Sequence, residues 1–560
     1  MTTAIATGPP LADEPGLGPL TLPGFLREVT ARYADRAAVC LPGETSWTYR
    51  ELWDRSMDVA RALRACGLGK DGRVGVLMTN RPEWLAAVFG TALAGGVAVT
   101  LSTFSTAAEL DHLLRTGAVS VLLFERQVAR TDFTDVLTDL EPAIRTTAPG
   151  ELRSAAYPFL RYLAVVGGAE PDGTVESWAD FLARGTVEPA ELITAIAEST
   201  RPGDTAVLFF SSGTTSKPKG ILSAHRGVTV QLWRFARMFG LGPNDTVRCW
   251  TANGFFWSGN FGQALGTTLA AGGTLVLQRI FDPTEAVTLL ESERITFPVA
   301  WPHQWAQLAA APNWDDADLS SMVFADRNTP AARHPTVATD YTDCGHAYGN
   351  TETFTISTCY PARTPDEVHA GSSGLPLPGV TVKIADPLTG EILPRGESGE
   401  ICIKSPTLML GYLGTPLDET VDAAGFFHTG DNGYLDESDR LYWTGRLTDI
   451  IKTGGANVSP LEVDEALAHY PGVKIARTVG VPHDTLGEIV VACVVPQGDT
   501  ELDAEALRSF VRERLAAYKV PRHVLFFDET DFTLTGSAKI KSSDLRELAA
   551  KRLTEPATPQ

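Results

Sequence analysis

A run of hydroxyl, glycine and lysine residues has the composition of a polyphosphate-binding loop. Residues 207–210 predict a buried strand, and the loop from Ser211 to Gly220 holds five hydroxyl side chains, two glycines and two lysines. Glycine lets backbone N–H groups approach a phosphate, hydroxyls donate hydrogen bonds, and lysine neutralises charge. A helical pattern begins near Ala224, so we expect the loop to connect a strand to a helix. A flexible Ser/Gly linker is the alternative interpretation.

Several familiar catalytic and metal-binding patterns are missing from the sequence. The loop lacks the Walker spacing of a P-loop NTPase, and no H-E-x-x-H or G-x-S-x-G motif occurs. The seven cysteines are scattered and form no C-x-x-C pair, so we expect reduced thiols and a cytoplasmic location. The net charge of -21 disfavours nucleic acid and anionic lipid as partners.

One uncharged stretch, residues 84–101, approaches the length of a membrane span. Gly95 and Gly96 interrupt it, and a β-rich segment follows at 97–100. A helix, a glycine turn and a buried strand explain this pattern better than a span. We therefore expect no transmembrane segment. Residues 1–23 also lack the basic start and apolar core of a signal peptide.

The elements around this stretch alternate between helix and strand. The spacing predicts a helix at 51–68, a strand at 73–78, a helix beginning at Pro82 and a strand after the glycine pair. Such alternation is typical of βαβ units and a mostly parallel sheet. The order of helix, glycine pair and strand at 89–97 recurs at 261–274, which predicts two related α/β subdomains.

From about Gly374 the pattern changes to short alternating strands between turns. Residues 380–384 and 399–403 predict strands of a β-rich subdomain. The predicted fold class is α/β, with a large N-terminal domain of two α/β subdomains plus the β-rich subdomain over residues 1–445. A small α+β C-terminal domain over 446–560 is long enough to fold separately. Its expected elements are a helix at 459–470, a strand at 490–495 and a helix at 504–517.

Five short motifs follow one another along the chain. They are the loop at 211–220, Tyr348–Thr353, His428–Asp431, Gly445–Arg446 with the stretch 452–460, and Thr535–Lys541. In sequence and in order, they resemble the motifs of the adenylate-forming superfamily of acyl-CoA synthetases, luciferases and peptide-synthetase adenylation domains. The stretch 452–460, with its two glycines, resembles the acyl-CoA ligases more than the peptide synthetases.

The resemblance implies a site for ATP and Mg²⁺. Tyr348 offers a flat face to adenine, Asp431 can accept from the ribose hydroxyls, and Arg446 can reach the ribose or the phosphates. Glu352 and Thr215 are the expected magnesium ligands, because Mg²⁺ prefers hard oxygen donors. The implied ATP-binding residues are Ser211, Ser212, Gly213, Thr214, Thr215, Lys219, Tyr348, Thr351, Asp431 and Arg446.

Lys539 is the expected catalytic residue. A substrate carboxylate must attack the α-phosphate of ATP, and a lysine between the two anions offsets their repulsion. A solvated lysine beside Lys541 is the alternative interpretation. Ala538 stands where the family usually has glycine, which makes this segment of backbone less permissive.

The family also rotates its C-terminal domain between two half-reactions. The resemblance places the hinge at Thr448, where the family often has Asp or Lys. After the rotation, a channel for the thiol of coenzyme A is expected beside Lys452, Gly454 and Gly455.

The acid pocket is expected near residues 255–261. Apolar and aromatic walls there suit a fatty or aromatic acid. Where the family has a small stretch facing adenine, this chain has residues 324–330, in which Arg327 and Asn328 either contact a polar group of the substrate or alter the adenine wall. The predicted pocket residues are His225, Phe256, Trp257 and Phe261, with contributions from Trp301, His303 and Phe354.

The resemblance implies an acyl-CoA ligase. ATP and a carboxylic acid would give acyl-AMP and pyrophosphate, and coenzyme A would then give acyl-CoA and AMP. Two alternatives stay open: the same adenylation with an amine or a carrier-protein thiol as acceptor, and a nucleotide- or acyl-binding protein without turnover.

Overall fold

The structure is a computed structural model that describes residues 2–168, 172–211, 218–369, 371–387, 389–447, 451–458, 460–498, 500–528, 531 and 542–554. Arg446 is described by its backbone alone. The predicted site residues that lie outside the described residues are Ser212, Gly213, Thr214, Thr215, Thr448 and Lys539.

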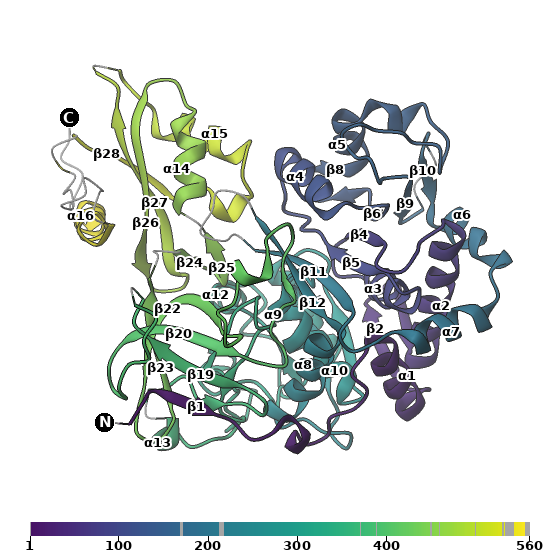
Figure 1. The fold of residues 1–560 in the computed structure, drawn as a ribbon, viewed down its shortest axis with the longest axis horizontal. Helices are drawn as coiled ribbons and strands as arrows, with labels where there is room; N and C mark the ends of the chain where they lie inside the picture. The colour runs from purple at the N-terminus through teal and green to yellow at the C-terminus, as the bar shows by residue number, and fades with distance from the viewer. Residues whose placement is uncertain are drawn as a thin grey trace.

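An eight-stranded sheet forms one part of the large domain (Figure 1). Its order is β10-β9-β6-β4-β5-β11-β12-β21, and neighbouring strands are parallel from β10 to β11. β12 is antiparallel to β11, and β21 is antiparallel to β12. The strands are β4 Arg73–Leu77, β5 Val97–Thr100, β6 Val121–Glu125, β9 Tyr162–Val166, β10 Val175–Ser177, β11 Thr205–Ser211, β12 Lys219–Ala224 and β21 Gly411–Tyr412.

A second sheet has the order β15-β13-β14-β2-β3, and its strands are parallel except for β3. Gly95 and Gly272 occupy equivalent turns ahead of β5 and β14, with φ of 76° and 73°. This left-handed backbone favours glycine at both turns and supports the predicted pair of related α/β subdomains. The strands are β2 Ala37–Leu41, β3 Thr45–Thr48, β13 Arg248–Thr251, β14 Thr274–Leu277 and β15 Phe297–Pro298.

The described part of the large domain has three further sheets, of which the smallest is the antiparallel pair of β7 Gln127–Val128 and β8 Thr131–Asp132. The predicted β-rich subdomain is an antiparallel sheet of order β1-β19-β20-β22-β23. A small antiparallel sheet of order β16-β17-β18 carries the Tyr348 motif. The strands are β1 Ile5–Thr7, β16 Ala347–Tyr348, β17 Thr358–Cys359, β18 Leu375–Pro376, β19 Thr381–Ala385, β20 Gly399–Lys404, β22 Phe427–Leu435 and β23 Leu441–Arg446.

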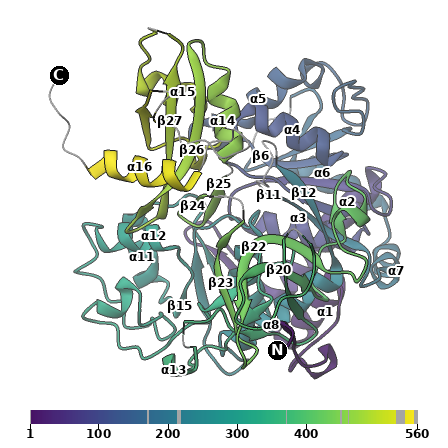
Figure 2. The same ribbon diagram turned by 60° about the vertical axis from the view of Figure 1, so that its left-hand side comes forward.

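The small C-terminal domain has its own sheet (Figure 2). It also has its own clusters of buried side chains. The sheet order is β25-β24-β27-β26, and β28 pairs in parallel with β27. Separate cores are what an independently folding unit requires. Its elements are β24 Ile451–Thr453, β25 Ala456–Val458, α14 Pro460–Ala468, β26 Val473–His483, β27 Gly487–Pro496, α15 Ala504–Arg512, β28 His523–Phe526 and α16 Ser542–Thr554.

Helices in the large domain begin where the sequence supplies caps. Thr48 and Thr106 each form a capping box, with Glu51 and Glu109 respectively. Such boxes satisfy backbone N–H groups that a helix start leaves without partners. The helices are α1 Leu22–Tyr33, α2 Tyr49–Ala65, α3 Pro82–Leu93, α4 Ala107–Gly117, α5 Phe133–Leu140, α6 Trp178–Arg184, α7 Ala190–Ser199, α8 His225–Met238, α9 Ser258–Asn260, α10 Thr267–Ala270, α11 Pro283–Ser292, α12 Pro302–Ala309 and α13 Asp366–His369.

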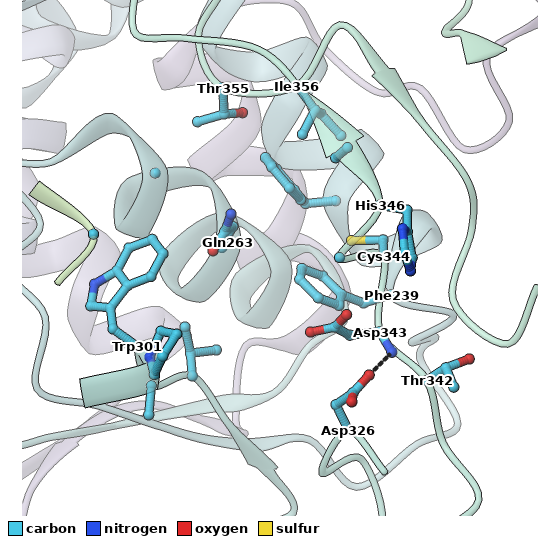
Figure 3. A pocket seen from close by; sticks show the side chains of 18 of the residues that line it. Phe239, Gln263, Trp301, Asp326, Thr342, Asp343, Cys344, His346, Thr355 and Ile356 are labelled. Carbon is cyan, nitrogen blue, oxygen red and sulfur yellow. Dashed lines mark hydrogen bonds between the residues drawn. The ribbon is translucent and has the colours of Figure 1, made fainter. Parts of the chain in front are cut away.

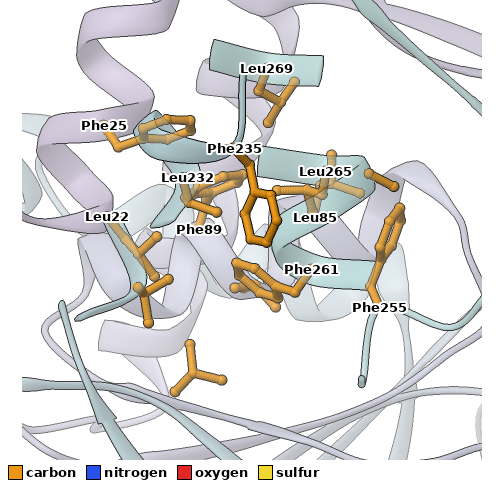
Figure 4. Close-up of a cluster of buried hydrophobic side chains, with 14 of the residues drawn as sticks. Leu22, Phe25, Leu85, Phe89, Leu232, Phe235, Phe255, Phe261, Leu265 and Leu269 are labelled. Atoms are coloured by element: carbon orange, nitrogen blue, oxygen red, sulfur yellow. The ribbon is translucent and has the colours of Figure 1, made fainter. Parts of the chain in front are cut away.

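One buried cluster joins the two α/β subdomains (Figure 4). Phe25 and Phe89 from the first part of the chain pack with Phe235 and Phe261 from the second. Residues 84–101 divide into α3, a turn and β5, as the glycine pair predicted. Within the described residues, no helix is both long enough and apolar enough to cross a membrane.

Two predicted boundaries are wrong. Lys219 to Ala224 form strand β12, so the predicted strand-to-helix loop instead connects two antiparallel strands. Ile221 is fully buried on this strand, and β12 fills the edge that β11 would otherwise expose. α15 ends at Arg512, before the expected 517, because the backbone N–H of Ala516 donates to Glu109 of the large domain instead of continuing the helix.

Candidate active site

A cavity of about 740 Å³ lies against the second α/β subdomain. Its apolar wall includes Phe235 of α8, Phe239 directly after that helix and Phe297 of β15. Figure 3 shows Trp301 on the opposite side from Cys344 and His346. A cavity of this size, in which aromatic side chains stand beside polar groups, is suited to a small molecule.

Two predicted nucleotide residues meet beside this cavity. Tyr348 and Thr351 both line it. The hydroxyl of Tyr348 donates to Oδ2 of Asp431 over 2.8 Å, and both side chains are buried. Strand pairing in the β-rich sheet sets Asp431 opposite the backbone of Arg446. The structure thus brings together three motifs that lie far apart in the sequence.

The remaining described ATP and magnesium residues converge on Tyr412, which sequence reasoning missed. Ser211 and Lys219 face each other across β11 and β12. The Lys219 ammonium lies 5.0 Å from the centroid of the Tyr412 ring, and the Tyr412 hydroxyl donates to Oε1 of Glu352 over 2.8 Å. A carboxylate near a lysine that is predicted to bind phosphate fits a magnesium ion, because Mg²⁺ binds carboxylates together with substrate phosphates.

The four predicted acid-pocket residues are not among those that line the larger cavity. Phe261 is fully buried in an aromatic cluster, with Phe209 at 5.8 Å between ring centroids. Phe256 and Trp257 line a second cavity of about 40 Å³, where Trp257 meets Tyr518 of the C-terminal domain at 5.8 Å. Their part in acid binding stays a prediction.

His225, the fourth of these residues, lies at the start of α8 and is 1% exposed. Its Nδ1 accepts a hydrogen bond from the backbone N–H of Leu22 over 3.2 Å. Burial lowers the pKa of His225 to about 4, so the imidazole is neutral at pH 7. Trp301, predicted only as a contributor, does line the larger cavity.

Strained backbone marks the same cavity. Phe354 and Thr355 follow one another with φ of 48° and 81°, a conformation that side chains with a Cβ atom rarely adopt. Thr355 lines the cavity, and its buried hydroxyl has no hydrogen-bond partner among the described residues. Strain of this kind concentrates at functional sites.

One of the residues predicted to flank a coenzyme A channel, Gly455, lies at the cavity, and the channel itself stays a prediction. Gly454 and Gly455 form the turn between β24 and β25, with φ of 55° and 81°. Gly455 lines the cavity, and a Cβ atom there would lie 2.9 Å from the Trp301 ring. The ammonium of Lys452 lies 3.8 Å from the ring centroid of Trp443. The C-terminal domain therefore supplies part of the cavity wall in this arrangement.

Comparison with known proteins agrees with this architecture. The AMP-binding enzyme family matches residues 26–413, and the AMP-binding enzyme C-terminal domain matches residues 462–539. The putative acyl-CoA synthetase YngI of Bacillus subtilis is 31% identical over 540 residues, 94% of this chain and 96% of the relative. Feruloyl-CoA synthase of Amycolatopsis sp. is 32% identical over 526 residues, 92% of this chain and 96% of the relative.

A solved structure has the same arrangement of elements. The amide bond synthetase McbA of Marinactinospora thermotolerans superposes with a TM-score of 0.73 at 27% identity, over 94% of this chain and 99% of that one. The fold and site thus define an adenylate-forming enzyme. The chain belongs to the AMP-binding enzyme family. These comparisons confirm the predicted family and fold class. They also confirm the predicted enzyme class, an AMP-forming acid–thiol ligase that uses ATP, Mg²⁺ and coenzyme A.

Proposed function

We propose that this enzyme adenylates a fatty or aromatic acid in the 740 Å³ cavity and transfers the acyl group to coenzyme A. A carboxylate oxygen attacks the α-phosphorus of ATP and pyrophosphate leaves; the thiol sulfur then attacks the acyl carbonyl and AMP leaves. The observation that carries the proposal is the junction at this cavity of an apolar wall, the Tyr348–Asp431 pair and the Gly454–Gly455 turn.

Each nucleotide contact has a proposed residue. Tyr348 stacks on adenine, and Asp431 accepts from the ribose hydroxyls with Arg446 nearby. Lys219 and the residues from Ser211 to Thr215 bind the phosphates. Glu352 and Thr215 would hold Mg²⁺, whose charge offsets that of the phosphates. The convergence of Lys219, Tyr412 and Glu352 supports this assignment.

Lys539 is the proposed catalytic residue, from the motif alone, since it lies outside the described residues. In the arrangement described, the Gly454–Gly455 turn lines the cavity, which favours the thiol-transfer state. A rotation about Thr448, near the proposed domain boundary at 445/446, would exchange that turn for Lys539. The cytoplasmic location stays a prediction.

The test separates the two half-reactions. We expect pyrophosphate release with an aromatic or fatty acid, and Lys539→Ala should lower that rate by about a hundredfold or more. Thiolysis of preformed acyl-AMP by coenzyme A should persist in the variant, because the lysine is needed only for adenylation. Undiminished adenylation by a folded K539A enzyme would contradict the assignment.

A second acceptor deserves a direct assay, because McbA, an amide bond synthetase, has the same fold over nearly the whole chain. Coenzyme A and a primary amine should be offered separately to enzyme loaded with acyl-AMP. We expect acyl-CoA to form at least tenfold faster than amide at equal acceptor concentrations. Faster amide formation would make the amine the acceptor, and adenylation would be unaffected.

A further inference from the structure

The larger cavity has an unusual charge for a site that binds an acid. Three aspartates, Asp326, Asp343 and Asp366, line it, and no lysine or arginine is among its described lining residues. Asp366 is compensated at the rim, where Arg327 donates to its Oδ2 over 2.5 Å. The cavity also contains His369, whose pKa is lowered by burial, so this imidazole adds no positive charge at pH 7.

Asp326 and Asp343 remain as a carboxylate pair without a cation. The backbone N–H of Asp343 donates to Oδ2 of Asp326 over 2.7 Å, and that of Asn328 donates to Oδ1 over 2.7 Å. Figure 3 shows Asp343 beside Phe239 on the cavity wall, with Asp326 next to it. No ion pair links either aspartate to a basic side chain in the described part of the chain. Backbone groups thus fix the carboxylate of Asp326, and the carboxyl group of Asp343 beside it can accept from a ligand.

The orientation of a bound acid follows from this charge. Its reacting carboxylate must face the nucleotide, on the side of Tyr348 and Thr351, and would be repelled by the two aspartates. The aromatic walls hold the body of the acid, so its distal end meets Asp343. A carboxylate out of bulk water is satisfied only by donors or cations.

We propose that Asp343, held by Asp326, selects acids whose distal end carries an N–H or O–H donor, such as an N–H heteroaromatic, amino-aromatic or phenolic acid. Acids with a second carboxylate at that end are excluded by repulsion. This inference rests on the proposed function and narrows its substrate class from any fatty or aromatic acid to polar-tipped aromatic acids.

Matched pairs of acids test the proposal with the wild-type enzyme. Indole-2-carboxylate against benzofuran-2-carboxylate, and 4-hydroxycinnamate against 4-methoxycinnamate, differ in one polar hydrogen. The measurement is kcat/KM for pyrophosphate release. We expect the donor member of the better-used pair to be favoured by about 10- to 100-fold, because a polar site rejects analogues that leave its groups unpaired. 4-Carboxycinnamate should be the poorest substrate.

Asp343→Asn removes the charge at nearly constant shape. The donor preference should fall to within about threefold of unity, and turnover of 4-carboxycinnamate should rise. Asp54→Asn on the exposed face of α2 is the matched control and should leave both ratios unchanged. Melting temperature reports folding of both variants. If D343N does not fold, the wild-type ratios decide alone.

Different results would overturn the proposed adenylation and the proposed role of Asp343. Absence of pyrophosphate release with every acid overturns the proposed function. Release with acids of every kind, with donor and non-donor members equal or with 4-carboxycinnamate among the best, overturns the role of Asp343 and leaves adenylation intact. A donor preference that survives unchanged in folded D343N also overturns it.

Discussion

His225 shows how one buried imidazole links stability to pH. Its Nδ1 accepts from Leu22, and burial lowers its pKa to about 4. The unfolded imidazole binds a proton below about pH 6.5, whereas the folded one does so only below about pH 4. Between these values the unfolded state binds more protons, so the free energy of unfolding falls as pH falls.

We therefore expect acidification from pH 7 to pH 4 to remove about 3 kcal/mol of stability through His225, with no further loss from this group below pH 4. Urea unfolding at several pH values would measure the effect. His225→Gln should flatten the slope across this window, and the exposed His469→Gln should not. Equal slopes in wild type and H225Q would contradict the shift.

For individual residues, the sequence motifs identified some of those that line or adjoin the cavity and missed others. The contact between Tyr348 and Asp431 joins two predicted residues, since each belongs to a recognisable motif. Tyr412 was missed because an isolated tyrosine beside a glycine carries no spacing signal. Asp343 was missed as well, because its significance depends on Asp326, seventeen positions away and brought close by tertiary folding.

Among the elements, the turn between β24 and β25 requires glycine at position 455 for two reasons, its left-handed backbone and its close approach to Trp301. Gly455 has φ of 81°, and an added Cβ atom would lie 2.9 Å from the Trp301 ring. Left-handed backbone costs a residue with a Cβ atom about 1 kcal/mol, and the clash with an indole ring adds to it. Any substitution should push this turn off the cavity wall.

Gly455→Ala is expected to slow acyl transfer to coenzyme A by about tenfold or more while acyl-AMP formation changes little. Single-turnover assays of each half-reaction would separate the two. Gly498→Ala is the matched control in the same domain: φ is 59°, and nothing lies within 4 Å of the added Cβ atom. Equal losses in both variants would point to backbone strain alone.

Element boundaries followed the sequence where local signals decided them. The Thr48 cap begins α2, and Pro82 begins α3. The predicted boundaries were wrong where a residue distant in the sequence determines the boundary. β12 forms because it pairs with the edge of β11, and α15 ends ahead of Ala516, whose backbone N–H donates to Glu109. Periodicity within one segment cannot report either partner.

For the whole molecule, the contact between the two domains centres on a buried cation. The Lys519 ammonium lies 2.7 Å from Oε1 of Glu462 in its own domain and 3.1 Å from Oε1 of Glu109 in the large domain. The Lys519 side chain is 2% exposed. Glu109 also accepts from the backbone N–H of Ala516 over 3.0 Å. This carboxylate thus helps to hold the C-terminal domain in the arrangement in which Gly455 lines the cavity.

A rotation of the small domain would separate Lys519 from Glu109 but not from Glu462, which moves with it. Glu109→Gln keeps a side-chain oxygen for the α4 cap and removes the charge that faces Lys519. Losing one partner of a buried cation costs on the order of 1–3 kcal/mol, and here the cost falls only on the arrangement that contains the contact. The balance between the two arrangements should therefore move away from thiol transfer.

We expect E109Q to lower the rate of acyl transfer to coenzyme A by about tenfold while acyl-AMP formation is unchanged or faster, in single-turnover assays of each step. Glu51→Gln is the matched control, because Glu51 completes the same capping box on α2 without a described contact to the C-terminal domain. A loss confined to adenylation, or the same loss in E51Q, would show that Glu109 does not stabilise the thiol-transfer arrangement.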